Sequence, residues 1–401
     1  MNSKERVSKT LKFIEPDRVP AGEWGIDHHI TEKVIGRKTY WRNRREETLA
    51  LWDGRRDEVV DSWKEDLVEL ILKLDHDLVP VCFCPSKNIE KAKIRKIDDE
   101  TWEDENGNVY RYTPGNDAIM CIKRRKREKI EIEDYEDVIK FFEEKYIPST
   151  PFEIVEKQGE NYRFSLKDES VLEFAKYVIE KLGREKFIFF RGLSEWIVPW
   201  ATDTENFFIQ IALKPHLVKK FFDLFTQLQI FIAEIFINLG VDAIMPSADF
   251  SDSTGPMVSP ERIRNIFLPG MKKLSEFVKS KNCFVMSHNC GNNWKIMDIL
   301  IEAGYQCYQS IQAKTGSMDI KLLKEKYGEK ISLWGGINIE TLIDGDEKEV
   351  EEEVKYALKY GAVGGGFILG TSNSVAYGTK YENYMKALET LKKYGNYPIS
   401  L

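Results

Sequence analysis

The decapeptide VMSHNCGNNW, residues 285–294, carries the end of an apolar run directly into polar residues. The run begins at Cys283 and gives way to the pair His288 and Cys290. A short apolar run of this kind, bounded by turn-forming residues, is typical of a buried strand. We therefore expect a strand over residues 283–288, with an imidazole and a thiol at its carboxyl end.

The same arrangement recurs along the chain and predicts the fold. The expected strands are a segment that follows Pro20 and runs to about Trp24, and residues 78–82, 187–191, 242–249, 283–288, 307–311, 331–338 and 365–371. Helical patterns separate them, and one of these begins at Ser259, a favourable N-cap that precedes Pro260. Strands that alternate with helices favour a parallel sheet. Eight such strands predict an α/β fold, the (β/α)8 TIM barrel.

The stretch between the second and third expected strands is too long for one helix. Within it, Asn106 and Gly107 form a strong hairpin signal between two alternating segments. Residues 94–123 are therefore predicted to be an inserted β-hairpin region. Because no repeat or linker composition divides the chain, residues 1–401 are expected to form a single barrel domain that carries this insertion.

Composition narrows the classes of function. The 401 residues include 59 basic and 66 acidic side chains, mixed along the chain, for a net charge of −7. This balance argues against a nucleic-acid surface, because such a surface needs clustered Lys and Arg. We expect no membrane span, since no segment approaches about 18 apolar residues. The polar N-terminus lacks a signal-peptide core, and six cysteines without a framework fit a reduced, cytoplasmic protein.

Polar and aromatic side chains follow nearly every expected strand. In a (β/α)8 barrel the active site lies at the carboxyl ends of the strands. The expected catalytic residues are Glu195, Asp249 and His288, and the expected substrate-binding residues are Trp24, His28, Trp196, Phe250, Asn338 and Ser372. Each aromatic residue is also compatible with a place at the rim of the core, and His28 with a loop cap. Together, these residues indicate a cleft.

The His288 and Cys290 pair admits two interpretations. Thiolate and imidazole are suitable zinc ligands, and one intervening residue lets both side chains reach the same ion. Zinc needs at least three protein ligands, however, and the pair supplies two. In the alternative interpretation, His288 is a hydrogen-bonded cleft residue and Cys290 is a small buried thiol.

Several segments, taken in order, resemble one known family. They are residues 3–20, SKERVSKTLKFIEPDRVP, the block 192–223, the strand and helix 240–274, SHNCGN at 287–292, WGGIN at 334–338 and GGFILGTSNSV at 365–375. In these segments the chain resembles the uroporphyrinogen decarboxylase superfamily, which includes cobalamin-dependent methyltransferases. The resemblance covers nearly the whole chain and implies the barrel fold.

Three branches of that superfamily differ in their motifs. The decarboxylases carry an arginine-rich motif after the first strand, where this chain reads GEWGIDHHITEK, residues 22–33, without arginine. Methylcobalamin:thiol methyltransferases hold zinc with a His-x-Cys pair and a cysteine near the eighth strand, but residues 370–372 contain no cysteine. The remaining branch moves a methyl group from a small substrate, such as a methoxylated aromatic compound, to the Co(I) of a separate corrinoid protein. The resemblance therefore implies a partner protein that carries cobalamin.

Some members of that branch are associated with zinc held by the pattern Glu-x14-Glu-x20-His. Glu180, Glu195 and His216 have this spacing. A five-residue strand, about 17 Å long, separates Glu180 from Glu195, so both should not reach one ion. The candidate zinc ligands are thus His288, Cys290, Glu195 and His216.

Other functions and assemblies stay open at this point. One alternative is a decarboxylase-like enzyme acting on a tetrapyrrole, and another is a methylcobalamin:thiol methyltransferase. A third is a non-catalytic protein that binds a tetrapyrrole or corrinoid. The oligomeric state is also open, with a homodimer as one alternative.

Overall fold

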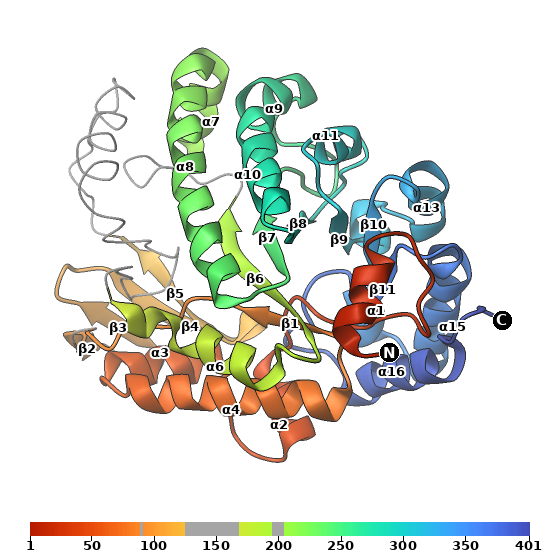
Figure 1. The fold of residues 1–401 in the computed structure, drawn as a ribbon. Helices are drawn as coiled ribbons and strands as arrows, with labels where there is room; N and C mark the ends of the chain where they lie inside the picture. Colours follow the sequence, from red (N-terminus) through yellow and green to blue (C-terminus); the bar gives the residue numbers. More distant parts are fainter. Residues whose placement is uncertain (89–90, 125–167, 195–203) are drawn as a thin grey trace.

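A computed structural model describes residues 1–88, 91–124, 168–194 and 204–401 (Figure 1). Its main feature is a sheet of parallel strands in the order β1-β6-β7-β8-β9-β10-β11. The strands are β1 Leu78–Val81, β6 Phe187–Ser194, β7 Ala243–Ser247, β8 Phe284–His288, β9 Cys307–Ile311, β10 Ser332–Ile337 and β11 Phe367–Thr371. Each lies within two residues of the expected bounds, except that β6 extends three residues further. Sequence order equals spatial order, as in a (β/α)8 barrel.

The first expected strand is an extended segment that bridges the two edges of this sheet. On one side, Leu369 N of β11 donates to Pro20 O (2.9 Å), and Gly22 N donates to Leu369 O (3.2 Å). On the other side, Asp77 N, which precedes β1, donates to Ala21 O (2.7 Å). The segment therefore occupies the eighth strand position, and the predicted barrel class is confirmed.

Helices surround the sheet, as Figure 1 shows. They are α1 Ser3–Thr10, α2 His28–Ile35, α3 Arg44–Trp52, α4 Arg56–Leu74, α6 Glu173–Leu182, α7 Thr204–Leu213, α8 Pro215–Leu239, α9 Pro260–Ile266, α10 Leu268–Ser280, α11 Met297–Glu302, α12 Ala313–Gly316, α13 Ile320–Tyr327, α14 Ile339–Asp344, α15 Glu347–Ala357 and α16 Tyr381–Tyr394. Short 3-10 turns cover Pro114–Asn116 and Glu169–Leu172, and a π-helical turn covers Leu358–Ala362. Ser259 caps α9 as expected, with its hydroxyl accepting from Arg262 N. The helix predicted from Ser259 is broken at Phe267 into α9 and α10.

Residues 94–123 form a separate antiparallel sheet of four strands. The strands are β2 Ile94–Lys96, β3 Thr101–Asp104, β4 Val109–Thr113 and β5 Ala118–Lys123, in the order β2-β3-β4-β5. Asn106 and Gly107 lie in the turn between β3 and β4. Trp102, Tyr110 and Ile119 pack against Trp52 of α3, which anchors this sheet to the helical layer.

The interior of the barrel is closed at its amino-terminal end. Alternate strand residues point inward, because successive side chains in a strand face opposite ways. This inner cluster comprises Leu78, Phe187, Phe189, Ala243, Met245, Met286, Cys307, Trp334 and Ile368, with Val7 of α1 and Leu11 just after it packed on it. Since α1 covers this end, the carboxyl ends of the strands remain for a functional site.

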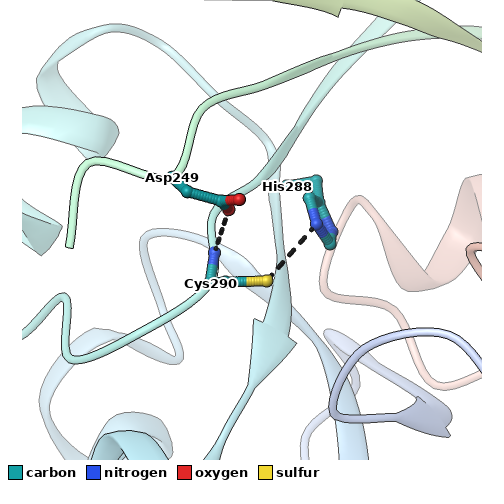
Figure 2. A group of neighbouring side chains, drawn as sticks. All are labelled: Asp249, His288 and Cys290. Carbon is teal, nitrogen blue, oxygen red and sulfur yellow. Dashed lines mark hydrogen bonds between the residues drawn. The ribbon is translucent and has the colours of Figure 1, made fainter. Parts of the chain in front are cut away.

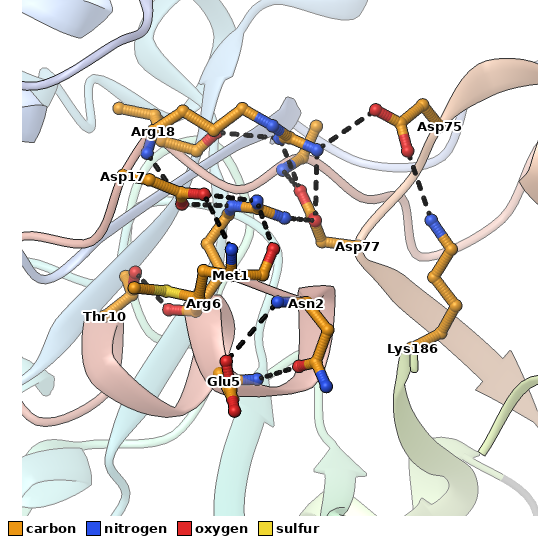
Figure 3. Close-up of polar contacts among 12 residues, drawn as sticks. Met1, Asn2, Glu5, Arg6, Thr10, Asp17, Arg18, Asp75, Asp77 and Lys186 are labelled. Carbon is orange, nitrogen blue, oxygen red and sulfur yellow. Dashed lines mark hydrogen bonds and ion pairs between the residues drawn. The ribbon is translucent and has the colours of Figure 1, made fainter. Parts of the chain in front are cut away.

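Ion pairs fasten α1 to the barrel (Figure 3). The Arg6 guanidinium contacts Asp77 Oδ1 at 2.6 Å and Asp17 Oδ1 at 2.7 Å. Arg18 also pairs with Asp77, at 2.7 Å, and the Asp77 side chain is fully buried. Two arginines thus neutralise one buried carboxylate at the start of β1.

No membrane span is expected from the sequence, and helix α8 is the segment of the described chain that bears on this expectation. By length and composition alone it could cross a membrane, with a mean hydropathy of 1.3 over 18 residues. The helix packs against α10, α9 and β7 in the outer layer of the barrel. Its apolar residues, including Phe221, Ile232 and Phe236, are part of the main hydrophobic core.

Candidate metal and active site

Asp249, His288 and Cys290 lie together at the carboxyl ends of β7 and β8, and we call them the donor triad. Their carboxylate, imidazole and thiol donor atoms all lie within 4.8 Å of one another. Cys290 Sγ is 3.5 Å from His288 Nε2, and Cys290 N donates to Asp249 Oδ1 at 3.0 Å (Figure 2). His288 is buried, Cys290 is half-buried and Asp249 is exposed.

The backbone after β8 brings Cys290 back towards the loop that carries Asp249. Gly291 has φ +87°, and a Cβ atom there would lie 2.4 Å from Ser251 O. Only glycine tolerates both the left-handed conformation and this close approach. Asn292 N then donates to Asp252 O at 2.7 Å, so the two loops are joined on both sides of the triad.

Gln309 of β9 fixes the tautomer of His288. Gln309 Nε2 lies 3.4 Å from Thr371 O and 3.3 Å from Asn373 O, two carbonyl oxygens that only accept. Gln309 Oε1 therefore faces His288 Nδ1, which must carry the hydrogen that it donates. The unprotonated Nε2 is left facing Cys290. Trp24 stacks on the same imidazole, with ring centroids 4.3 Å apart, and keeps the ring in this plane.

Electrostatics favour the neutral forms of His288 and Cys290. Burial lowers the pKa of His288, against the opposing effects of Gln309 and of Asp249. Burial, together with the nearby Asp249 charge, raises the pKa of Cys290 to about 12. A nucleophilic cysteine needs the opposite environment. A cation between the three donors would stabilise the thiolate and use the carboxylate as a ligand.

The donor set fits zinc. Zinc is bound by Cys sulfur, His nitrogen and Asp oxygen, and catalytic sites combine three protein ligands with one open position. The unprotonated Nε2 of His288 is the form that binds a metal, and its Nδ1–H is held by Gln309, as the second shell of such sites requires. The described residues thus include a group of three donors that could hold a metal ion.

Of the other predicted site residues, Trp24 and Ser372 lie beside the triad, whereas Phe250 does not face it. Trp24 contacts His288, as described. Ser372 is buried close by, and its carbonyl accepts from Ser310, a neighbour of Cys290. Phe250 is fully buried against Phe267 in the core, so its ring does not face the triad.

Three further predicted residues make their contacts outside the donor triad or lie apart from it on the surface. Asn338 uses both polar atoms of its side chain, accepting from Lys314 N and donating to Glu353. His28 lies 3.4 Å from Asp117 of the inserted sheet and stacks on Tyr377. His216 is exposed in the first turn of α8 and belongs to no metal-ligand group in the described residues. Glu195 and Trp196 lie outside the described residues.

Gln309, Ser310 and Asn373 are among the polar residues at the ends of the expected strands, but no catalytic, substrate-binding or metal-binding role was predicted for them. Ser310 Oγ lies 3.4 Å from Cys290 Sγ, and Asn373 Nδ2 donates to the same sulfur at 3.2 Å. Ser310 has φ +96°, an unfavourable conformation for a residue with a side chain, and such strain gathers at functional sites. The available signal was their position at the ends of β9 and β11.

Comparisons with known proteins support the predicted family and the fold. Residues 199–394 match the model of the uroporphyrinogen decarboxylase (URO-D) family. The predicted family resemblance is confirmed over this segment. The URO-D segment contains β7 to β11, and therefore the whole donor triad.

Solved structures extend the likeness beyond the URO-D segment. A methyltransferase from Methanosarcina mazei superposes with a TM-score of 0.63 and 19% identity, over 98% of this chain and 99% of its own. A B12-independent methionine synthase from Shewanella sp. W3-18-1 gives a TM-score of 0.47 and 12% identity, over 94% of this chain and 98% of its own. No curated protein matches the chain in sequence. The first likeness supports the same fold over nearly the whole chain.

Proposed function

We propose that this protein is a zinc-dependent methyltransferase. It moves a methyl group from a small, methoxylated aromatic substrate to the Co(I) of a corrinoid held by a separate protein. The observation that carries the proposal is the donor triad at the open end of a URO-D barrel. The fold shared with the Methanosarcina mazei methyltransferase supports the class of reaction.

Asp249, His288 and Cys290 are the residues that would hold the zinc. Bound zinc would supply a Lewis acid for the ether oxygen, which otherwise leaves as a poor phenolate. The cobalamin of the partner protein would supply the methyl acceptor. Because the ether oxygen keeps the electron pair of the broken bond, the organic product is a phenolate, which then takes a proton.

The chain's own residues prepare the site for this role. Gln309 and Trp24 orient the His288 imidazole with Nε2 towards the triad. Asp249 is exposed, so in the described part of the chain the triad is open to solvent on the side of this carboxylate. The negative charge of Asp249 and the thiol of Cys290 favour a cation at the triad over an anion.

Metal content and methyl transfer together test the proposal. Elemental analysis of the purified protein should give about one zinc per chain, and His288→Ala should lose it. With cob(I)alamin as acceptor and a panel of methoxylated aromatic acids and phenols, the protein should release the phenol and form methylcobalamin in equal amounts. Zinc that stays bound in His288→Ala, or a metal-loaded protein that demethylates no substrate, would contradict the proposal.

The same preparation separates the alternative functions. A methylcobalamin:thiol methyltransferase would consume methylcobalamin when a thiol is added and would leave methoxylated aromatics intact. A decarboxylase would release carbon dioxide from a tetrapyrrole carboxylate. A binding protein would retain a corrinoid or tetrapyrrole without turnover of any of these compounds.

A further inference from the structure

Arg191 of β6 lies at the mouth of the barrel, the end formed by the carboxyl ends of the strands, and none of the roles proposed above uses it. Phe187 and Phe189 of the same strand belong to the inner cluster of the barrel. Because alternate residues of a strand face the same way, Arg191 also points inward, one layer nearer the mouth. A cationic side chain therefore lies among the inward-facing residues at the functional end of the barrel.

The pairing of β6 with β7 changes directly after Arg191. Arg191 pairs with Met245 of β7, but the next pair joins Ser194 to Ser247, so β6 has one residue more than β7 between these pairs. Gly192, with φ +144°, lies in this bulge. Bulges redirect side chains and are common beside active sites. The regular part of the strand thus ends at the arginine.

Two tryptophans place the guanidinium next to the donor triad. Arg191 Cζ lies 5.3 Å from the ring centroid of Trp24 and 5.9 Å from that of Trp41. The Trp24 ring also stacks on His288, with ring centroids 4.3 Å apart. One side chain therefore contacts both the guanidinium and a proposed metal ligand. Aromatic rings of this kind hold a planar guanidinium in a fixed orientation, with its N–H groups directed along its own plane.

Trp41 adds a second hydrogen-bond donor beside Arg191. This residue is only 2% exposed, and its Nε1–H finds no acceptor among the described residues. A buried donor without an acceptor is rare and costly, and an acceptor on a bound ligand would satisfy it. The guanidinium carries several N–H donors, so a carboxylate can take a pair of them beside its other contacts. The surroundings of Arg191 are therefore suited to an anion.

We infer that Arg191 is a specificity-determining residue that binds a carboxylate on the aromatic ring of the substrate. The inference rests on the proposed function and narrows its substrate class to methoxylated aromatic carboxylates. Arg191 attracts the carboxylate end of such a compound, whereas the charge of Asp249 repels that end from the donor triad. The ether end is thereby directed to the triad. Opposite charges at two places in the mouth thus orient the substrate before methyl transfer.

Binding of a matched pair of compounds tests this role without turnover. 4-Methoxybenzoate and 4-methoxybenzamide have nearly the same shape, but only the first carries a negative charge at neutral pH. Isothermal titration calorimetry measures the affinity of the purified protein for each compound. Wild type should bind the acid at least about tenfold more tightly than the amide, because a bidentate bond from arginine to a carboxylate is among the stronger hydrogen bonds. The ratio of the two affinities is the deciding quantity.

Variants of Arg191 should change that ratio in a graded way. Arg191→Met keeps much of the apolar contact with the tryptophans but removes the guanidinium, so it should weaken the acid at least about tenfold and leave the amide within about twofold of wild type. Arg191→Lys keeps the charge without the planar fork, so its ratio should be intermediate and more sensitive to salt. Arg264→Met is the matched control. It removes an exposed arginine of α9, which pairs with Glu302, and should leave the ratio unchanged.

A second comparison separates Arg191 from a metal as the group that binds the carboxylate, since carboxylates are also zinc ligands. After treatment with a chelator, wild type should still prefer the acid. Arg191→Met should show no preference with or without metal. A preference that disappears with the metal and survives in Arg191→Met would assign the carboxylate to the metal and overturn the inference.

Each remaining result also decides the inference. A wild-type protein that binds both compounds equally, or neither, overturns it. Equal weakening of both compounds in Arg191→Met overturns it too, because Arg191 then only supports the walls of the mouth. If Arg191→Met does not fold, which its urea transition would reveal, Arg191→Lys decides. A ratio reduced several-fold in Arg191→Lys then supports the inference, and an unchanged ratio overturns it.

These outcomes can be told apart from the failure of the proposed function. A protein that demethylates neutral methoxylated compounds and does not prefer the acid would keep the proposed function and lose the carboxylate role of Arg191. A protein that prefers the acid through Arg191 but transfers no methyl group would keep that role and lose the proposed reaction.

Discussion

His288 donates from Nδ1 to Gln309 Oε1, and this one contact decides which imidazole nitrogen faces Cys290. Gln309 cannot reverse its amide, because its Nε2 donates to two backbone carbonyls, one at the end of β11 and one in the loop after it. The tautomer of His288 is therefore set by the end of the barrel's last strand. A metal that uses Nε2 finds it unprotonated and already oriented.

Replacing Gln309 by methionine should weaken metal binding without unfolding the barrel. Methionine fills a similar volume but neither accepts from Nδ1 nor donates to the carbonyls. Loss of such a partner typically costs about 10–100-fold in metal affinity. Competition with a chromophoric chelator measures the affinity of wild type and Gln309→Met. An affinity equal to that of wild type would show that Gln309 does not orient His288.

Asp249 is expected to be the third metal ligand. Asp249→Asn keeps the shape and the hydrogen bond from Cys290 N, but removes the charge that a dication needs. We expect a loss of metal affinity of at least about tenfold. Asp252→Asn is the matched control, because Asp252 lies on the same loop, is exposed and belongs to no metal-ligand group in the described residues. Equal losses in both variants would point to a general charge effect.

Glu23 should make stability depend on pH. Burial raises its pKa to about 8, against weaker effects from Thr371 and Tyr384. Between pH 4.5, the ordinary value, and about 8, the folded state holds a proton that the unfolded chain has lost. The free energy of unfolding therefore falls as pH rises through this window, by at most ~1.4 kcal/mol per pH unit.

The variant Glu23→Gln isolates that contribution. Glutamine keeps an acceptor for Thr371 but does not ionise, so the stability of wild type relative to the variant should fall from about pH 5 to about pH 8. His76, whose pKa burial lowers to about 4, is present in both proteins and cancels in the difference. Urea unfolding at several pH values measures it. Parallel pH profiles for the two proteins would mean that Glu23 is ionised at neutral pH.

The barrel could be predicted because each of its strands leaves a recognisable pattern in a short stretch of the sequence. The run from Cys307 to Ile311 was placed to the residue, since a run this short between two helical patterns has few alternative structures. The first strand was less regular than predicted, because residues 20–22 make their hydrogen bonds to two distant edges and not in a continuous ladder. Hydrogen bonds between residues far apart in the chain leave no pattern in a short stretch of the sequence.

The candidate site was predictable only in part, for a related reason. His288 and Cys290 are two residues apart, so their proximity is nearly local. Asp249 was predicted as a catalytic residue, but its place beside them depends on the neighbouring positions of β7 and β8 and on the turn at Gly291. Asn373 reaches the same sulfur from 83 positions away. Glu195 and His216 matched a spacing, and spacing alone does not show where a side chain points.

The closed end of the barrel offers a test of stability that leaves the donor triad untouched. Arg6 of α1 contacts the fully buried Asp77 and bridges it to Asp17. Arg6→Ala removes one of two cations that neutralise a buried carboxylate, which should lower the free energy of unfolding by about 3 kcal/mol. Arg18 remains and limits the loss. Lys272→Ala, which breaks an exposed pair with Glu302, is the control and should change stability little.

The same network should respond to acid in a defined direction. The hydrogen bond from Arg6 lowers the pKa of Asp17 to about 2, so the stability that this pair contributes is lost as pH falls from 3.8 towards that value. The difference between wild type and Arg6→Ala should therefore shrink over this range, although Asp17 is 41% exposed and solvent reduces the effect. Urea unfolding at neutral and acidic pH measures the difference. A difference that stays constant down to the lowest pH would assign the stabilisation to Asp77 alone.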